Sequence, residues 1–239
     1  MRALLDLVLD AHGGLRRWQQ ARTIRAKGSI GGLLWTLRGQ EGILATTDAT
    51  VDVQQQHLVF DGFTGPGLRG LFTPDRVAIE RYDGQVVAER RAPRGAFAGH
   101  GPDTPWDQLH ALYFAGYALW NYLTAPYLLT RDGVVVEELQ PWRENSEDWR
   151  RLRARFPQAL ATHAAEQVFY YDAAGLLRRH DYAPDVLGST PAAHFSENHV
   201  TVSGLVFPTH RYVVPVQEDG HAMPEPILIT IDLTELSVT

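Results

Sequence analysis

The sequence contains no cysteine, and this absence excludes several kinds of chemistry. Disulfides, zinc sites with cysteine ligands, iron–sulfur clusters and thiol nucleophiles all need that side chain. The chain also has no excess of positive charge, since its net charge is −6 and its pI is about 5.9. A mildly acidic surface repels phosphate backbones, so we expect no nucleic-acid partner.

A long apolar run is missing at the N-terminus. Asp6 and Asp10 interrupt the apolar residues there, so the pattern of a signal peptide is not met. The chain also lacks an Asn-x-Ser/Thr sequon for N-glycosylation. From these absences we expect a cytoplasmic protein without a stable membrane span.

Motifs of several enzyme classes are missing as well. The sequence has no G-x-S-x-G, no P-loop and no HExxH spacing. The stretch GPGLRG at residues 65–70 matches the glycine pattern of dinucleotide sites, but Pro74 leaves no room for the helix that must follow. We therefore expect a loop at 65–70, no nucleotide and no other cofactor.

The residues that are present predict an antiparallel sheet. From Thr23 onward, short strand-like segments alternate with turn residues. Asp83-Gly84 and Ser203-Gly204 are typical two-residue hairpin turns, and Ala173-Ala174-Gly175 is typical of a three-residue loop. About ten to twelve short strands in consecutive hairpins form an antiparallel sheet.

Three segments of this pattern are less regular. Gly31-Gly32 indicates a hairpin turn between strands at 23–30 and 33–38, and we expect a further strand at 42–46. Residues 145–156 contain WRRLRARF, which fits either a basic helix or a strand. The alternation of its side chains favours the strand.

Residues 104–127, TPWDQLHALYFAGYALWNYLTAPY, form the one long helical pattern. Thr104 suits the N-cap, Pro105 suits the first helical position, and Pro126 ends the helix. A helix that is apolar on all sides is buried, either as plain core or as the lining of a ligand cavity. As a membrane span the segment is barely long enough, and it contains polar residues.

Together these patterns predict a mainly β protein of the α+β class, with a single domain over residues 1–239. Residues 2–11 alternate as a short amphipathic helix that precedes the sheet. A large antiparallel sheet curls, and one that wraps a buried helix is an unclosed β-barrel. We expect this half-open barrel around the helix at 104–127.

Four stretches resemble a known family: AHGGLRRWQQARTIRAKG, FYYDAAGLLRRHDY, AAHF and VFPTHRYVV. They resemble proteins of the LolA-like superfamily, which includes the bacterial lipoprotein carrier. The resemblance implies a half-open antiparallel barrel over helices, with an apolar cavity that accepts acyl chains in the carriers. The carriers are exported with a signal sequence, and the N-terminus of this chain does not show that pattern. We therefore expect a bacterial branch of the superfamily without a signal sequence.

Aromatic residues on the predicted helix and strands are suited to a pocket for a large apolar ligand, although ordinary core packing is the favoured explanation for any single one of them. The residues that we expect to bind such a ligand are Trp35, Phe60, Tyr113, Tyr117, Trp120 and Tyr170.

Histidines gather in the last third of the chain, on neighbouring hairpins. Glu197 would pair across from His210, with His199 next on the same face, which fits either a metal site, an acid–base pair or a solvated surface. We expect no metal.

His180 and Tyr182 share one face of a strand, while Asp181 points to the other face. We name His180, Tyr182 and His194 as candidate catalytic residues, because burial in an apolar cavity shifts their pKa values. Plain hairpin packing is the alternative.

The sequence is compatible with three functions. The first is binding of a hydrophobic small molecule, such as an acyl chain, a polyketide or a terpenoid. The second is a cofactor-independent enzyme, a cyclase or isomerase of natural-product biosynthesis, that uses the same cavity with His or Tyr as acid or base. The third is a scaffold that binds a partner protein and has no pocket.

Overall fold

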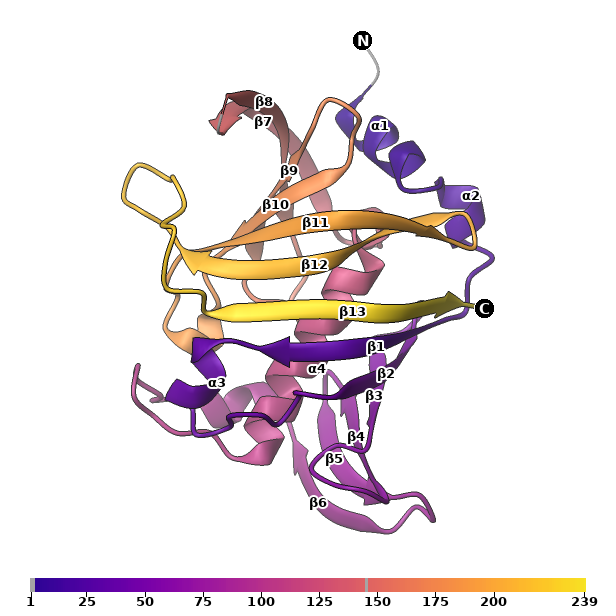
Figure 1. Cartoon of the computed structure of the whole chain (residues 1–239), viewed down its shortest axis with the longest axis vertical. Coiled ribbons are helices and arrows are strands. Elements are labelled where there is room, and N and C mark those ends of the chain that lie inside the picture. Colours follow the sequence, from indigo (N-terminus) through magenta and orange to yellow (C-terminus); the bar gives the residue numbers. More distant parts are fainter. Residues whose placement is uncertain (1–2, 145) are drawn as a thin grey trace.

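A single curved sheet dominates the computed structural model, which describes residues 3–144 and 146–239. Within those residues, thirteen antiparallel strands lie in the order β6-β5-β4-β3-β2-β1-β13-β12-β11-β10-β9-β8-β7. The sheet wraps around helix α4 (Gln108–Thr124) without closing, because β6 and β7 remain its two edges (Figure 1). The predicted half-open barrel around a buried helix is confirmed.

The elements have the following bounds. The strands are β1 (Thr23–Gly31), β2 (Thr47–Asp52), β3 (His57–Asp61), β4 (Leu68–Thr73), β5 (Arg76–Arg81), β6 (Val86–Arg91), β7 (Val135–Glu144), β8 (Glu147–Arg155), β9 (Glu166–Tyr171), β10 (Leu177–Tyr182), β11 (Ala192–Val202), β12 (Leu205–Pro215) and β13 (Ile229–Val238). The other helices are α1 (Leu4–Ala11), α2 (Leu15–Trp18), α3 (Leu33–Leu37), η1 (Pro93–Phe97), η2 (Tyr127–Thr130) and η3 (Asp185–Leu187).

The order of the strands explains the position of α4. The chain starts at the middle of the sheet with β1 and adds β2 to β6 outward to one edge. Helix α4 then carries it across the concave side to the other edge, and β7 to β13 return inward (Figure 1). β13 pairs with β1, so the first and last strands join the two halves of the sheet.

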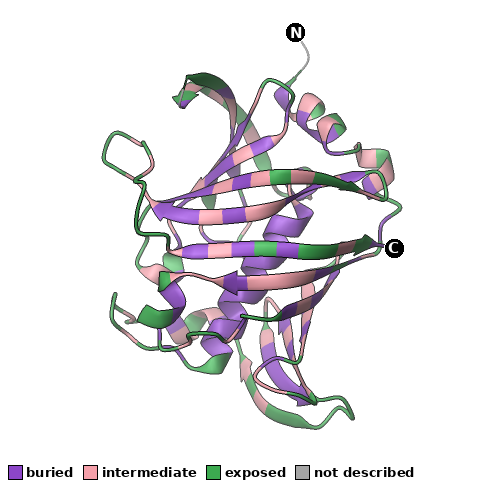
Figure 2. Cartoon of the chain, viewed as in Figure 1, coloured by how far each residue is buried: buried purple, intermediate pink, exposed green. Residues whose placement is uncertain are grey.

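Helix α4 begins with a capping box. The Asp107 carboxylate accepts the backbone N–H of His110 at 2.9 Å, and His110 Nδ1 accepts the N–H of Asp107 at 3.3 Å. Although burial opposes it, the ion pair with Arg90 lowers the pKa of Asp107 to about 2. The helix thus begins a few residues after the predicted cap at Thr104. Every residue from 109 to 124 is buried, as the all-round apolar pattern predicts (Figure 2).

Two predicted strands are not strands. In the segment 33–38, residues 33–37 form helix α3, which places Leu34 and Trp35 in the core. The backbone N–H of Leu34 bonds to the carbonyl of Leu228. The short apolar run has no alternation that would separate a strand from a helix. Residues 42–46 form turns, although the backbone N–H of Ile30 still bonds to the carbonyl of Leu44.

The loop expected at residues 65–70 is only partly a loop. From Leu68 onward the chain is strand β4, paired with β3 and β5. Gly70 lies inside this strand. A larger residue would not fit there, because its Cβ would lie 2.8 Å from side-chain atoms of Phe63 and Leu112. The glycine allows β4 to pack closely against α4. Its match to the dinucleotide pattern is unrelated to this role.

Other expectations hold. Asp83-Gly84, Ala173-Ala174-Gly175 and Ser203-Gly204 all connect antiparallel neighbours, and residues 147–155 form strand β8 rather than a helix. Ser203 and Gly204 both have positive φ, as a two-residue hairpin turn of this kind requires. Within residues 3–144 and 146–239, no helix is long and apolar enough to cross a membrane.

Candidate functional site

A group of polar side chains lies buried on the concave side, where α4 meets β9 to β12 and the 157–165 segment. Most proteins fill this position with apolar side chains, so a polar group there needs mutual hydrogen bonds. The members are Tyr117, Tyr122, His163, Gln167, His180, Tyr182, His194, Ser196 and Arg211, which we call the core polar cluster.

Hydrogen bonds join most of the cluster into one chain. The first half starts on α4, where Tyr117 Oη lies 3.1 Å from His163 Nδ1. The other nitrogen of that ring, Nε2, lies 2.6 Å from Tyr122 Oη. Tyr122 Oη also lies 2.8 Å from Tyr182 Oη on β10, so one hydroxyl of the helix links a loop to the sheet.

The second half of the chain runs across β10, β11 and β12. Tyr182 Oη lies 3.3 Å from His194 Nδ1, and His194 Nε2 lies 3.5 Å from an Nη of Arg211. The same guanidinium donates to Ser196 Oγ at 2.8 Å. Arg211 therefore ends the chain, and its side chain has only 2% of its surface exposed.

Arg211 determines which group donates and which accepts in each hydrogen bond of this chain. A guanidinium can only donate, so His194 Nε2 is the acceptor and His194 Nδ1 carries the ring proton. His194 then donates to Tyr182, Tyr182 donates to Tyr122, and Tyr122 donates to His163 Nε2. One buried cation thus orders every link from β12 to the 157–165 segment.

Burial keeps the histidines of the cluster neutral. It lowers the pKa of His163 to about 3, with a smaller effect from the charge of Arg94. It also lowers the pKa of His180 and His194 well below the ordinary value, and raises the pKa of Tyr182. At neutral pH the cluster offers hydroxyl and imidazole groups that can polarise a carbonyl in a dry environment.

His180 lies beside this chain of hydrogen bonds and has a separate partner. Its Nε2 lies 2.7 Å from Gln167 Oε1, and its ring stacks on Phe169 with centroids 4.0 Å apart. The ring centroids of His180 and Tyr182 are 4.8 Å apart, and those of His180 and His194 are 6.0 Å apart. The structure thus brings the three candidate catalytic residues together.

Five of the six aromatics predicted to bind a ligand lie in the main core, which surrounds α4: Trp35, Phe60, Tyr113, Tyr117 and Trp120. Tyr117 belongs to the core polar cluster. The indole N–H of Trp120 donates to the carbonyls of Asp52 and Gln55 at 2.8 and 2.9 Å, which ties α4 to the β2–β3 turn.

Tyr170 lies apart from the other five, on the opposite face of the sheet. Its hydroxyl donates to Asp181 at 2.7 Å, and the guanidinium of Arg179 lies 5.0 Å from the centre of its ring. Arg179 also pairs with Asp181 and Glu144, each at 2.7 Å. These residues form a second buried polar group, in which two carboxylates balance the cation.

An apolar pocket of about 70 Å³ opens between α3, η3 and β11 to β13. Its lining residues are Leu34, Phe114, Tyr182, Pro184, Leu187, Thr190, Pro191, Ala192, Val213, Leu228 and Ile229. Tyr182 is shared between this apolar pocket and the core polar cluster, so the pocket leads to the hydrogen-bonded chain.

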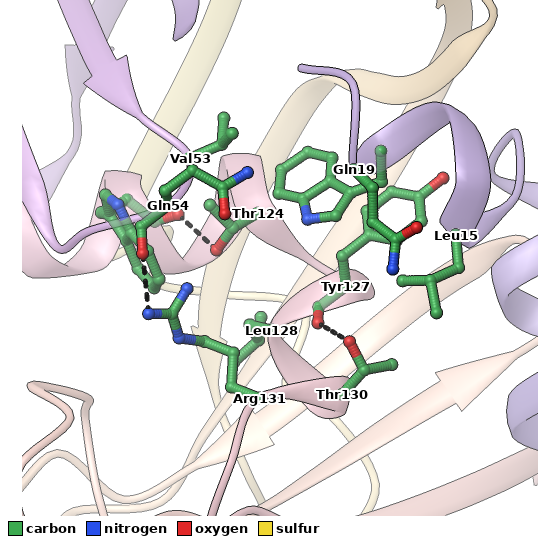
Figure 3. A pocket seen from close by; sticks show the side chains of 11 residues that line it. Leu15, Gln19, Val53, Gln54, Thr124, Tyr127, Leu128, Thr130 and Arg131 are labelled. Carbon is green, nitrogen blue, oxygen red and sulfur yellow. Dashed lines mark hydrogen bonds between the residues drawn. The ribbon is translucent and has the colours of Figure 1, made fainter. Parts of the chain in front are cut away.

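A larger pocket of about 260 Å³ lies at the end of α4, beside α2 and the β2–β3 turn (Figure 3). Trp18 stacks on Tyr127 with ring centroids 4.4 Å apart, and Arg131 covers Trp120 at 5.3 Å. Arg131 also donates to the carbonyl of Gln54 at 2.9 Å. Polar groups surround this pocket, and it does not reach the core polar cluster.

The remaining candidate histidines have separate partners. Glu197 pairs across from His210 as predicted, but His210 Nδ1 lies 2.6 Å from Asp232 Oδ1. The ring of His199 lies 6.4 Å from that of His12. In the described part of the chain, no group of three or more histidine, cysteine or acidic side chains is placed to hold a metal ion.

Sequence reasoning missed five of the nine residues of the cluster, which are Tyr122, His163, Gln167, Ser196 and Arg211. His163 lies in an irregular segment, where no periodicity indicates which way a side chain points. Tyr122 is one of many aromatics on an apolar helix. One sequence signal could have indicated Arg211. It lies two residues before the apolar Val213 on the same strand, so both side chains point to the same buried face.

No family model matches the chain, and no curated protein matches it in sequence. Solved structures do match its fold. A DUF1329 family protein from Desulfovibrio piger is 12% identical, with a TM-score of 0.59 over 98% of this chain and 91% of that one.

Two further structures are similar to this chain. A LolA superfamily protein from Nitrosomonas europaea has a TM-score of 0.56 at 9% identity, over 100% of this chain and 94% of that one. A putative outer membrane lipoprotein-sorting protein domain from Vibrio parahaemolyticus has a TM-score of 0.54 at 9% identity, over 98% and 91%. The fold of this chain is therefore LolA-like, as the resemblance of its sequence implied.

Proposed function

We propose that this protein binds a hydrophobic small molecule, such as an acyl chain, a polyketide or a terpenoid, inside the half-barrel. The observation that carries the proposal is the apolar pocket, whose wall passes from Leu34 and Phe114 to Tyr182. A concave, mostly apolar site with a few placed polar groups is what small-molecule binding needs. The LolA-like fold supports the same function, because one similar structure is described as a lipoprotein-sorting domain.

The outer wall of the apolar pocket is a short connection. Residues 183–191 join β10 to β11, and Asp185 in that segment pairs with Arg94 at 2.5 Å. A ligand larger than the pocket enters by moving this connection outward, which costs one exposed ion pair and few backbone bonds. The sheet itself need not change.

Native mass spectrometry of the protein purified from its own host tests the proposal, followed by extraction of any bound molecule. We expect a defined apolar compound, since a ligand that stabilises the folded state survives purification when it binds tightly. Thermal unfolding with added acyl chains and polyketides is the second measurement. An empty protein without any thermal shift would contradict the proposal and favour a scaffold that binds a partner protein.

A second candidate function is a cofactor-independent cyclase or isomerase. Tyr182 favours it, because this residue lines the apolar pocket and its hydroxyl belongs to the hydrogen-bonded chain. Such an enzyme would use the chain to polarise a carbonyl of a folded substrate. Conversion of the extracted ligand, with a rate that falls in His194→Gln, would distinguish the enzyme from a binding protein that returns its ligand unchanged.

A further inference from the structure

Arg211 is a buried cation without an anionic partner. Its guanidinium donates to Ser196 Oγ at 2.8 Å and to the backbone carbonyl of Tyr122 at 3.0 Å, and its third neighbour is His194 Nε2. All three acceptors are neutral. Among the residues that the structure describes, no aspartate or glutamate forms an ion pair with Arg211.

Two other arginines of the described chain are buried. Arg38 donates to two backbone carbonyls, whereas Arg179 has acidic partners. Arg179 is fully buried on the opposite face of the sheet, and both Glu144 and Asp181 pair with it at 2.7 Å. A buried charge is normally balanced in this way, since the desolvation cost of a lone ion is large. Unlike Arg179, Arg211 thus has room for an anionic partner from outside the chain.

Helix α4 supplies only part of the compensation. Tyr122 lies in its last turn, so Arg211 faces the negative end of a dipole equivalent to roughly half an elementary charge. Burial lowers the pKa of Arg211 to about 10, which leaves the side chain protonated at neutral pH. The helix end therefore stabilises the cation without neutralising it.

Further buried polar atoms lack a partner, on Arg211 itself and on a group of side chains around His12. The Nε of Arg211, the hydroxyl of Tyr171 and the Nε2 atoms of His12 and His199 are buried and lack a hydrogen-bond partner in the described chain. The ring of His12 lies 6.5 Å from Tyr171 and 6.4 Å from His199.

The charge of Arg211 reaches both histidines, because after burial it contributes to lowering the pKa of each. Asp172 is the acid that acts on them in the opposite direction, and its Oδ1 already accepts two backbone N–H groups. The surroundings of Arg211 thus hold unused hydrogen-bonding groups and a net positive potential, which suits an anionic oxygen ligand.

The apolar pocket ends beside this cation. Ala192 on β11 and Val213 on β12 line the pocket. His194 and Arg211 come two residues further along the same faces of these strands, which is roughly 7 Å. Tyr182, which lines the pocket, forms a 3.3 Å hydrogen bond with His194, and His194 in turn lies beside Arg211.

We infer that the ligand of the half-barrel is an amphiphile with an anionic head group, a carboxylate or a phosphate, that pairs with Arg211 while its apolar tail lies in the pocket toward α3 and η3. This inference rests on the proposed function and names the ligand class. The head group would replace the Tyr182–His194 hydrogen bond by a charge-assisted one.

Binding of three matched probes tests the inference: dodecanoic acid, dodecyl phosphate and dodecan-1-ol, each below its critical micelle concentration, by calorimetry at fixed ionic strength. The tails are identical and only the head groups differ. We expect the acid or the phosphate to bind roughly ten- to hundredfold more tightly than the alcohol, as for a buried hydrogen bond to a charged group. Whichever anion binds more tightly identifies the head group.

Arg211→Met should abolish this preference, whereas Arg211→Lys should retain part of it. Arg179→Met is the matched control, because it removes a buried arginine outside the half-barrel and should leave the preference intact. Equal binding of all three probes to the unmodified protein, or an unchanged preference in Arg211→Met, would overturn the inference while the proposed function stands.

Further outcomes are distinct. If no probe binds and the purified protein is also empty and shows no thermal shift with acyl chains or polyketides, both the proposed function and the inference fall; if no probe binds but another apolar ligand does, only the inference falls. If inorganic phosphate alone raises the unfolding temperature through Arg211 and the tail adds nothing, the site is for a free anion and the amphiphile is wrong.

A further test needs no variant. The carboxyl group of dodecanoic acid is labelled with ¹³C, and the pKa of the bound acid is measured by NMR. Pairing with Arg211 must hold the pKa of the bound acid below that of the free acid, and a raised pKa would contradict the pairing.

Discussion

Tyr122 Oη lies 2.6 Å from His163 Nε2 and 2.8 Å from Tyr182 Oη, so one hydroxyl of α4 holds both the 157–165 segment and the sheet. Tyr122→Phe would leave an imidazole nitrogen and a phenol without their partners in a site that water does not reach. We expect a loss of about 1 to 3 kcal/mol in the free energy of unfolding, measured with urea. Tyr82→Phe, at a residue that is 56% exposed, should have no effect.

Gly116 sets how closely α4 approaches β4. A Cβ at this position would lie 2.4 Å from Cγ of Phe72, a ring that is itself fully buried. Gly116→Ala raises helix propensity by roughly 1 kcal/mol, but overpacking costs roughly 1 to 3 kcal/mol. We expect a lower melting temperature, and Gly116→Ala combined with Phe72→Leu should recover part of it. A more stable Gly116→Ala would show that the helix can move outward freely.

Stability should fall in mild acid because of His163. Its pKa is about 3 in the folded protein and about 6.5 when unfolded, so below pH 6.5 the unfolded chain binds the extra proton. The loss begins near pH 6.5, grows as the pH falls, and levels off near pH 3. At pH 4.5 it amounts to about 2 to 3 kcal/mol from this residue.

Urea unfolding at a series of pH values measures this slope. His163→Gln keeps a group that can bond to both tyrosines but does not titrate. Its slope between pH 4 and 6 should be smaller by about one proton. Equal slopes in the two proteins would mean that His163 does not stay neutral.

Arg179 is a buried arginine on the face of the sheet opposite to Arg211, and it is paired with carboxylates. Arg179→Met would leave the carboxylates of Glu144 and Asp181 facing each other without their cation. We expect a loss of roughly 3 to 5 kcal/mol at pH 7, as for one partner removed from a buried ion pair. Adding Glu144→Gln and Asp181→Asn to the variant should restore much of it, which thermal unfolding would show. Arg211→Met leaves no such carboxylate behind and should cost less.

Much of this fold was readable from the sequence, and the limits have physical causes. Turn residues at 83–84, 173–175 and 203–204 placed the hairpins, and the uncharged segment at 109–124 revealed the buried helix. The segment 33–37 was misread because a five-residue apolar run fits both a strand and a helical turn. Its conformation depends on contacts with Leu228, which is distant in sequence.

The site was predictable only where strand alternation applied. His180 and Tyr182 share a face by strand alternation, as predicted, and the pairing of His180 with His194 across β10 and β11 adds the third residue. His163 could not be placed, since its position depends on hydrogen bonds that hold the 157–165 segment inside the sheet. One of these joins the side chain of Gln56 to the carbonyl of Ala161 at 2.8 Å.

The pairing of β1 with β13 has a consequence for synthesis of the chain. The middle of the sheet is completed by β13, which is made after the other twelve strands, and residue pairs such as Ile24 with Val238 are more than two hundred positions apart. Until then the β1–β6 half exposes an unpaired edge at β1, and α4 is covered on one side only. Such distant contacts slow folding and leave an edge open to aggregation, so the nascent chain needs protection until its C-terminal strand is made.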